Sequence, residues 1–198
     1  MVTVLLLAMG YGLGSIPTGV LIARWWKGVD IRQYGSGNIG MTNVLRTAGK
    51  GAAALTLAGD LAKGLIPVLF AHTWLTSPWG IGLVGLAAIL GHMYPSLAGF
   101  HGGKGVATTL GVFIPLLPFP LVIAFLIWVA CVAVRKQVSL GSLSAAAALP
   151  LVALLWQAHP AYIICALLAA VLIWYRHQEN IQRLLAGTEP FIGQQVNL

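Results

Sequence analysis

The chain has 198 residues, of which 59% are hydrophobic and only 8% are charged, whereas soluble domains carry about 25% charged residues. This composition excludes an ordinary soluble globule and indicates an integral membrane protein. The formal net charge is +7, but the basic residues are spread over short loops, which favours an anionic lipid or substrate over nucleic acid as the partner. With four carboxylates, and with Cys131 and Cys165 inside apolar runs, we expect no disulfide, no metal site and no cofactor.

Apolar segments of membrane-helix type run through most of the chain. We expect seven of them, at residues 2–23, 51–74, 79–98, 105–117, 119–134, 139–156 and 161–175. The fourth is short and begins directly after a glycine-rich stretch, so we interpret it as a half-helix that turns its positive N-terminus toward an anion. The sequence thus predicts an all-α polytopic membrane protein with seven transmembrane helices, in a single domain over residues 1–198.

The orientation follows from the positions of the basic residues. Apart from Lys63, which lies inside the second apolar segment, all of the 11 Lys and Arg residues fall on one side of the predicted helices. Trp74, Trp79 and Trp156 fall on the other side, where an aromatic belt is expected. We therefore expect the N-terminus outside and the C-terminus in the cytoplasm.

The loop after the first segment has the composition of an oxyanion site. Its glycines, among them Gly37, let backbone N–H groups converge, and Arg46 adds a planar charged fork. Neutral donors come from Ser36, Asn38, Thr42 and Asn43. The glycine spacing also fits a dinucleotide-binding fingerprint, but no strand precedes it and no βαβ unit follows, so that fold is excluded. The alternative is a flexible glycine-rich turn without a ligand.

A second glycine-rich stretch, Gly102-Gly103-Lys104-Gly105, opens the fourth segment. A lysine at a glycine-rich helix start can hold a phosphate, although the spacing of a Walker A motif is not met. Lys104 could instead be an interfacial lysine whose head group reaches toward water.

Three smaller groups fall near the same face. Asp60 and Lys63 are three residues apart inside a membrane helix, where they either shape a site or only neutralise each other. Ser142 either contacts a phosphate or belongs to the cap of the sixth helix. His177 and Asn180 either contact substrate or belong to a solvated helix end.

What the sequence lacks also narrows the chemistry. It contains no G-x-S-x-G elbow, and no histidine is followed by an aspartate five positions on. The general-base motif of the acyl-CoA-dependent glycerolipid acyltransferases is therefore absent. Direct transfer in a cationic, hydrogen-bonding pocket remains.

Taken together, these loops closely resemble the bacterial acyl-phosphate:glycerol-3-phosphate acyltransferase family, PlsY. The resemblance extends over nearly the whole chain. It rests on Ser36-Gly-Asn-x-Gly-x-Thr-Asn43, Gly59-Asp60-x-x-Lys63-Gly64, Gly91-His92-x-x-Pro95, Gly102-Gly-Lys-Gly-Val-Ala-Thr108, Ser139 to Ser142, and His177-x-x-Asn180-Ile-x-Arg183.

The resemblance implies transfer of a fatty acyl group from acyl phosphate to the sn-1 hydroxyl of glycerol 3-phosphate. The products are lysophosphatidic acid and inorganic phosphate, in the first acylation step of phospholipid biosynthesis. It also implies a multi-pass enzyme of the bacterial inner membrane whose site faces the cytoplasm. The positive inner face would suit a peripheral protein that delivers acyl phosphate.

The same resemblance assigns roles to residues. Lys104, Arg46, Ser142 and His177 are expected to be catalytic, and Asp60 and Lys63 to shape the site. Substrate binding is assigned to Ser36, Gly37, Asn38, Thr42, Asn43, Gly102, Gly103, Asn180 and His92. A histidine placed like His92 often satisfies backbone or loop groups instead. The base is either His177, whose ordinary pKa suits the task, or a substrate phosphate.

The rival interpretation is a membrane transporter of a phosphorylated metabolite. It would also need cationic residues and broken helices, but its charges should line a route across the bilayer. Here they gather on one side, which favours an enzyme. A purely structural scaffold would not explain three polar loops on that side.

Overall fold

The computed structural model describes residues 1–96 and 99–193, and the α-helices of these ranges run nearly end to end along the chain. They are α1 (Val2–Gly14), α2 (Thr18–Lys27), α3 (Met41–Thr47), α4 (Lys50–Trp74), α5 (Pro78–Met93), α6 (Val106–Leu116), α7 (Pro118–Arg135), α8 (Val138–Leu155), α9 (Pro160–Arg176) and α10 (Gln178–Leu185). A short 3-10 helix, η1 (Ile31–Gln33), follows α2. The prediction of an all-α fold is confirmed.

Several helices have the length and hydropathy of membrane spans. Among the described residues, four candidates meet both requirements, namely α1 with α2, then α4, α7 and α8. There are five if α9 and α10, bent by 63°, form one span. The apolar helices α5 and α6 have 16 and 11 residues. Each predicted segment thus contains a helix, but the count of seven spans stays a prediction. The predicted end of the third segment, Ala98, lies outside the described residues, and α5 ends at Met93.

The first apolar segment is broken, whereas the sequence predicts an uninterrupted helix over residues 2–23. α1 ends at Gly14 and α2 begins at Thr18, directly after Pro17. Proline cannot donate the hydrogen bond that would continue the helix. At the break, the carbonyl of Ile16 accepts a hydrogen bond of 3.0 Å from Lys63 Nζ. The same carbonyl also accepts the N–H of Thr18 at 2.9 Å, so the hydrogen bond from Lys63 links α4 to a break that is already hydrogen-bonded locally.

Glycines bring α4 and α6 into backbone contact. A Cβ on Gly64 would lie 2.2 Å from the carbonyl oxygen of Thr108, and one on Gly111 would lie 2.0 Å from that of Leu61. Small residues at helix contacts are the usual means of close packing in membrane bundles. This packing fixes the start of α6, and with it the preceding loop, against α4.

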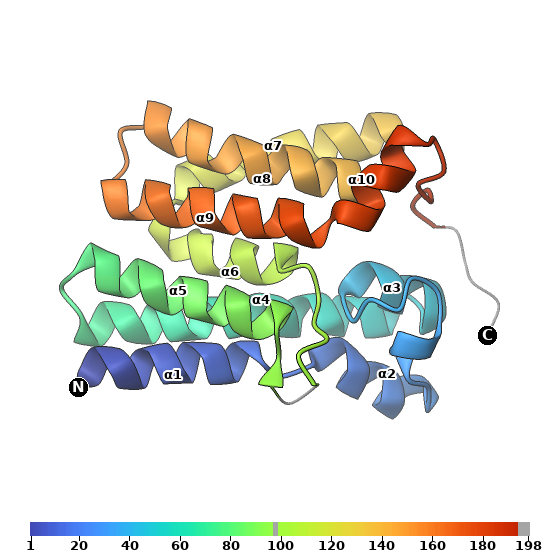
Figure 1. The fold of residues 1–198 in the computed structure, drawn as a ribbon, viewed down its shortest axis with the longest axis horizontal. Helices are drawn as coiled ribbons and strands as arrows, with labels where there is room; N and C mark the ends of the chain where they lie inside the picture. Colours follow the sequence, from blue (N-terminus) through green and yellow to red (C-terminus); the bar gives the residue numbers. More distant parts are fainter. Residues whose placement is uncertain (97–98, 194–198) are drawn as a thin grey trace.

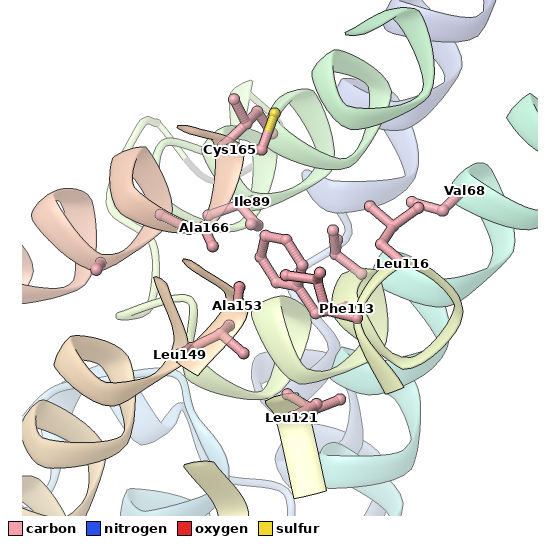
Figure 2. Close-up of a cluster of buried hydrophobic side chains, with 14 of the residues drawn as sticks. Val68, Ile89, Phe113, Leu116, Leu121, Leu149, Ala153, Cys165 and Ala166 are labelled. Atoms are coloured by element: carbon pink, nitrogen blue, oxygen red, sulfur yellow. The ribbon is translucent and has the colours of Figure 1, made fainter. Parts of the chain in front are cut away.

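The larger apolar core is formed by residues of α1 and of α4 to α9. Its centre is the fully buried Phe113 of α6. Figure 2 shows its ring among Ile89 of α5, Ala153 of α8 and Ala166 of α9. Dispersion contacts of this kind hold the long helices together where the lipid supplies no hydrophobic driving force.

A smaller core lies beneath the glycine-rich loop. Val20, Ile31, Ile39 and Val44 are its largest buried members, and they join α2, η1 and α3. In Figure 1, α2, α3 and α10 lie at the end of the bundle opposite the N-terminus, and the link from α5 to α6 turns at the same end of these two helices. The polar loops are therefore gathered at one end of the bundle.

Candidate active site

A cavity of about 870 Å³ lies where the polar loops meet the helices. Its polar lining comes from the glycine-rich loop, α3, α4, the end of α5, the start of α6, α8, the junction of α9 and α10, α10 and the segment after α10. Its apolar lining comes from Leu110, Leu121, Ala124, Phe125, Trp128, Ala145, Ala146 and Leu149. The lining thus suits an amphipathic ligand with an anionic head and an apolar chain.

The cavity brings together most of the residues that the sequence analysis assigned. They are Ser36, Asn38, Thr42, Asn43, Arg46, Asp60, His92, Lys104, Ser142, His177 and Asn180. Four assigned residues do not line it: Gly37, Lys63, Gly102 and Gly103. Gly37 N–H donates to the carbonyl of Tyr34 over 3.0 Å, inside the loop.

Gly102 and Gly103 were expected to contact substrate directly, but neither lines the cavity. The N–H of Gly103 donates to the carbonyl of His92 over 3.1 Å. The carbonyls of both glycines accept hydrogen bonds from Arg176, at 2.9 Å for Gly102 and 3.3 Å for Gly103. Since these backbone groups are committed within the protein, the two glycines position the loop that carries Lys104.

Asn43 organises the glycine-rich loop from inside. Its side-chain oxygen accepts the N–H of Ser36 at 3.1 Å, and its amide donates to the carbonyls of Ile31 and Tyr34 at 3.0 and 3.1 Å. Asn38 similarly accepts the N–H of Gly40 at 2.9 Å. The loop is therefore a hydrogen-bonded structure rather than a flexible turn.

Arg46 lines the cavity, and its positive charge is not paired with a carboxylate of the described residues. Within the described ranges, no hydrogen bond or ion pair engages its guanidinium. Burial lowers its pKa, Glu189 opposes that change, and Arg183 adds to it. A half-buried guanidinium without a paired carboxylate is a favourable partner for an anion, because an anion would restore the stability that burial and Arg183 remove from its charged form.

Lys104 begins a chain of hydrogen bonds that ends at a buried carboxylate. Its Nζ donates to the side-chain oxygen of Asn180. The amide of Asn180 donates to Glu189 Oε1 at 2.6 Å, and Arg183 Nε donates to Glu189 Oε2 at 2.8 Å. Burial raises the pKa of Glu189, but the nearby polar side chain of Ser139 and the hydrogen bonds from Arg183 and Asn180 outweigh burial and lower that pKa. Arg183 thus neutralises Glu189 and leaves the charge of Lys104 for a ligand.

Glu189 is a residue of the candidate site to which the sequence analysis assigned no role. It lies in the segment after α10, and no motif or periodicity marks it there. Its side chain is only 5% exposed. One signal for Glu189 was present in the sequence, namely that acidic residues are rare in this chain, which has four.

His177 and Ser142 face the cavity with part of their hydrogen-bonding capacity already used. His177 Nδ1 lies 2.8 Å from the carbonyl of Ile173, so the Nδ1 nitrogen carries the proton and Nε2 remains for a ligand. Ser142 Oγ donates to the carbonyl of Val138 at 2.9 Å and accepts from Trp128 Nε1 at 3.4 Å. Ser142 lies within the second turn of α8 and does not cap it.

Beneath the polar loops lies a buried ionic cluster. Asp60 Oδ1 is 2.8 Å from Lys63 Nζ and 3.5 Å from His92 Nδ1, and it accepts a hydrogen bond from the hydroxyl of Thr18. The three ionisable side chains are at most 4% exposed. In the parts of the chain that the structure describes, no group of three or more His, Cys, Asp and Glu side chains offers a metal site.

Nearly the entire chain matches one family. The family model described as glycerol-3-phosphate acyltransferase matches residues 4–187. The chain belongs to the glycerol-3-phosphate acyltransferase family. Curated family members of this name include one from Geobacter sulfurreducens, 49% identical over 93% of this chain and 95% of that protein. Another, from Parasynechococcus marenigrum, is 47% identical over 96% of this chain and 90% of that protein.

Solved structures of the family share this fold. The crystal structure of PlsY (YgiH), an integral membrane glycerol 3-phosphate acyltransferase, in its glycerol 3-phosphate form, aligns with a TM-score of 0.93 and 41% identity over 98% of this chain and 96% of that chain. Its lysophosphatidic acid form aligns with a TM-score of 0.91 and 40% identity over 98% and 97%. The chain is therefore an integral membrane acyltransferase, as the sequence predicts.

Proposed function

We propose that the protein transfers a fatty acyl group from acyl phosphate to the sn-1 hydroxyl of glycerol 3-phosphate, releasing lysophosphatidic acid and inorganic phosphate. The observation that carries this proposal is the pair of cations, Arg46 and Lys104, at the polar end of a cavity whose remaining wall is apolar. Both substrates carry a phosphate, and one of them also carries a long acyl chain. The glycerol 3-phosphate and lysophosphatidic acid forms of the related PlsY structure support the choice of acceptor and product.

The polar lining supports binding of both phosphate groups. Ser36, Asn38, Arg46, Lys104 and Ser142 hold the phosphates, with the hydroxyl of Ser142 turning from the Val138 carbonyl to do so. His177 and Asn180 position glycerol 3-phosphate. The acyl chain lies along the apolar lining contributed by α6, α7 and α8.

The reaction needs positioning more than new functional groups. The sn-1 oxygen forms a bond to the acyl carbon, the bond from that carbon to the phosphate oxygen breaks, and the phosphate leaves with the electron pair. A mixed anhydride is already activated, so holding it beside the hydroxyl and neutralising the charge on the leaving phosphate supply much of the catalysis. Lys104 or Arg46 offsets that charge. The hydroxyl proton goes to Nε2 of His177 or to an acyl-phosphate oxygen.

The proposal includes a topology. The seven apolar segments span the bacterial inner membrane as one domain, with the N-terminus outside and the C-terminus in the cytoplasm. The gathering of Arg46, Lys104, Arg176 and Arg183 at one end of the bundle supports this orientation by the positive-inside rule. A peripheral protein that delivers acyl phosphate would dock on this cytoplasmic face.

The test is to purify the protein in detergent and follow labelled glycerol 3-phosphate into lipid with each of three donors. We expect labelled lysophosphatidic acid with acyl phosphate alone, without added metal, and none with acyl-CoA or acyl carrier protein thioester. Product from a thioester but not from acyl phosphate would overturn the assignment of the donor. No product from any donor, with glycerol 3-phosphate accumulating inside reconstituted vesicles, would indicate a transporter.

The charge on Lys104 predicts an alkaline limit to activity. Burial and then the charge of Arg183 lower the pKa of Lys104 to about 8, while Glu189 acts in the opposite direction. The ammonium is present below that pKa and is lost above it, so kcat/KM should fall about tenfold per unit once the pH exceeds this value. The measurement is kcat/KM between pH 6 and about 10, corrected for spontaneous hydrolysis of the donor.

Arg183→Gln provides the control for this limb. It removes a positive charge near Lys104 and frees the negative charge of Glu189, and both changes raise the pKa of the lysine. The falling limb should therefore move to higher pH. A limb that keeps its place in this variant would mean that another group titrates.

A further inference from the structure

The cluster of Asp60, Lys63 and His92 lies below the phosphate-binding loops and has no part in the proposed chemistry. All three side chains are at most 4% exposed. Together with Thr18 they join three elements at one carboxylate oxygen: the start of α2, α4 and the end of α5. Lys63 also reaches the carbonyl of Ile16 in the break before α2. Burying this much charge is costly in a membrane protein, which makes a functional role for the cluster the first hypothesis to test.

The cluster reaches the Lys104 loop through the ring of His92. A Cβ on Gly103 would lie 2.1 Å from His92 Nε2, and the three atoms nearest to that position all belong to the His92 ring. The carbonyl of His92 also accepts the N–H of Gly103. The imidazole thus fills the space against the peptide that directly precedes Lys104, with Arg176 holding the carbonyls of this loop.

We propose that His92, oriented by Asp60, is a positioning residue. Its ring packs against Gly103 and so holds the Lys104 ammonium where it contacts phosphate. Asp60 Oδ1 lies 3.5 Å from the ring nitrogen Nδ1, and the opposite edge of the ring, with Nε2, faces Gly103. Lys63 neutralises Asp60. This role rests on the proposed function, because it acts only through Lys104.

The first experiment is a double-mutant cycle between His92 and Gly103. His92→Asn keeps an amide near Asp60 but withdraws the part of the ring that faces Gly103. Gly103→Ala should lower kcat/KM about tenfold or more in the wild-type background, and by less than about twofold in the His92→Asn background, where the added methyl group finds space. The same loss in both backgrounds would overturn the proposed contact.

Gly102→Ala is the matched control. Its Cβ would meet the carbonyl oxygens of His92 and Met93 and a ring carbon of Pro95, none of which His92→Asn removes. Its effect should therefore multiply with that of His92→Asn. If His92→Asn also reduced the loss of kcat/KM caused by Gly102→Ala, then His92→Asn would loosen the whole loop. That result would overturn the assignment of the contact to Gly103.

The second experiment separates positioning from fold stability. His92→Asn alone should lower kcat/KM about tenfold and move the alkaline limb of the pH profile toward higher pH, because a loosened loop admits water to Lys104. Arg176, Arg183, Glu179 and Glu189, the charged neighbours of Lys104, are unchanged in this variant. If the loss of activity is explained by a lower melting temperature and the alkaline limb keeps its wild-type pH, the positioning role would be overturned. Wild-type transfer in the same assay shows that a failure concerns His92 and not the proposed function.

Discussion

Replacing Lys104 by alanine is expected to lower kcat/KM by about 10²- to 10³-fold while the protein stays folded. Its ammonium is one of two cations at the polar end of the cavity that no carboxylate contacts in the described ranges, and removal of one such charge-stabilising group costs about this much in other enzymes. The measurement is steady-state transfer with acyl phosphate, together with the melting temperature in detergent.

Lys104→Arg is the comparison variant. It keeps the charge but not the geometry with Asn180, so we expect partial recovery relative to alanine. Near-normal turnover by Lys104→Ala would show that Lys104 is an interfacial lysine, the alternative that its position in the sequence left open. An equal loss of melting temperature in both variants would instead assign it to the fold.

Replacing Asp60 by alanine is expected to destabilise the protein by about 3–5 kcal/mol, because Lys63 would remain buried without its carboxylate. Thr18 would lose its acceptor as well. Lys63→Met in the same chain removes the orphaned charge, so the double variant should recover much of the melting temperature. The measurement is thermal unfolding in detergent of both variants and of the wild type.

Activity of the double variant decides between the two roles of the Asp60–Lys63 pair. If the pair only stabilises the fold, transfer should recover along with the melting temperature. Because His92 loses its partner in the double variant, we expect transfer to stay low although stability returns. A variant Asp60→Ala as stable as the wild type would contradict the ionic role altogether.

Much of the fold is readable from hydropathy alone. Runs of apolar residues and the prolines and glycines between them place a helix in each of the seven predicted segments, because every backbone group in lipid must be satisfied within its own helix. The break at residues 15–17 was not predicted. This segment is apolar on both sides of the break, and Lys63, which donates a hydrogen bond to Ile16 at the break, lies 47 residues further along the chain.

The site was partly predictable for a similar reason. Ser36 to Arg46 and the Lys104 loop carry glycines and polar donors close together in the chain, so their chemistry is visible locally. The place of Gly103 against His92 and the turn of the Ser142 hydroxyl toward Val138 depend on contacts that local composition does not encode.

Composition, hydropathy and the short motifs were enough for the class of protein, its helices, its family and most of the polar residues that line the cavity. The tertiary structure alone decided which of those residues touch one another. Lys104 and Asn180 are 76 residues apart, and Asn180 then leads to Glu189 in a segment without any motif. Pattern in a sequence reports the local environment of a residue, whereas a buried hydrogen bond between distant residues exists only once helices have packed and excluded other partners.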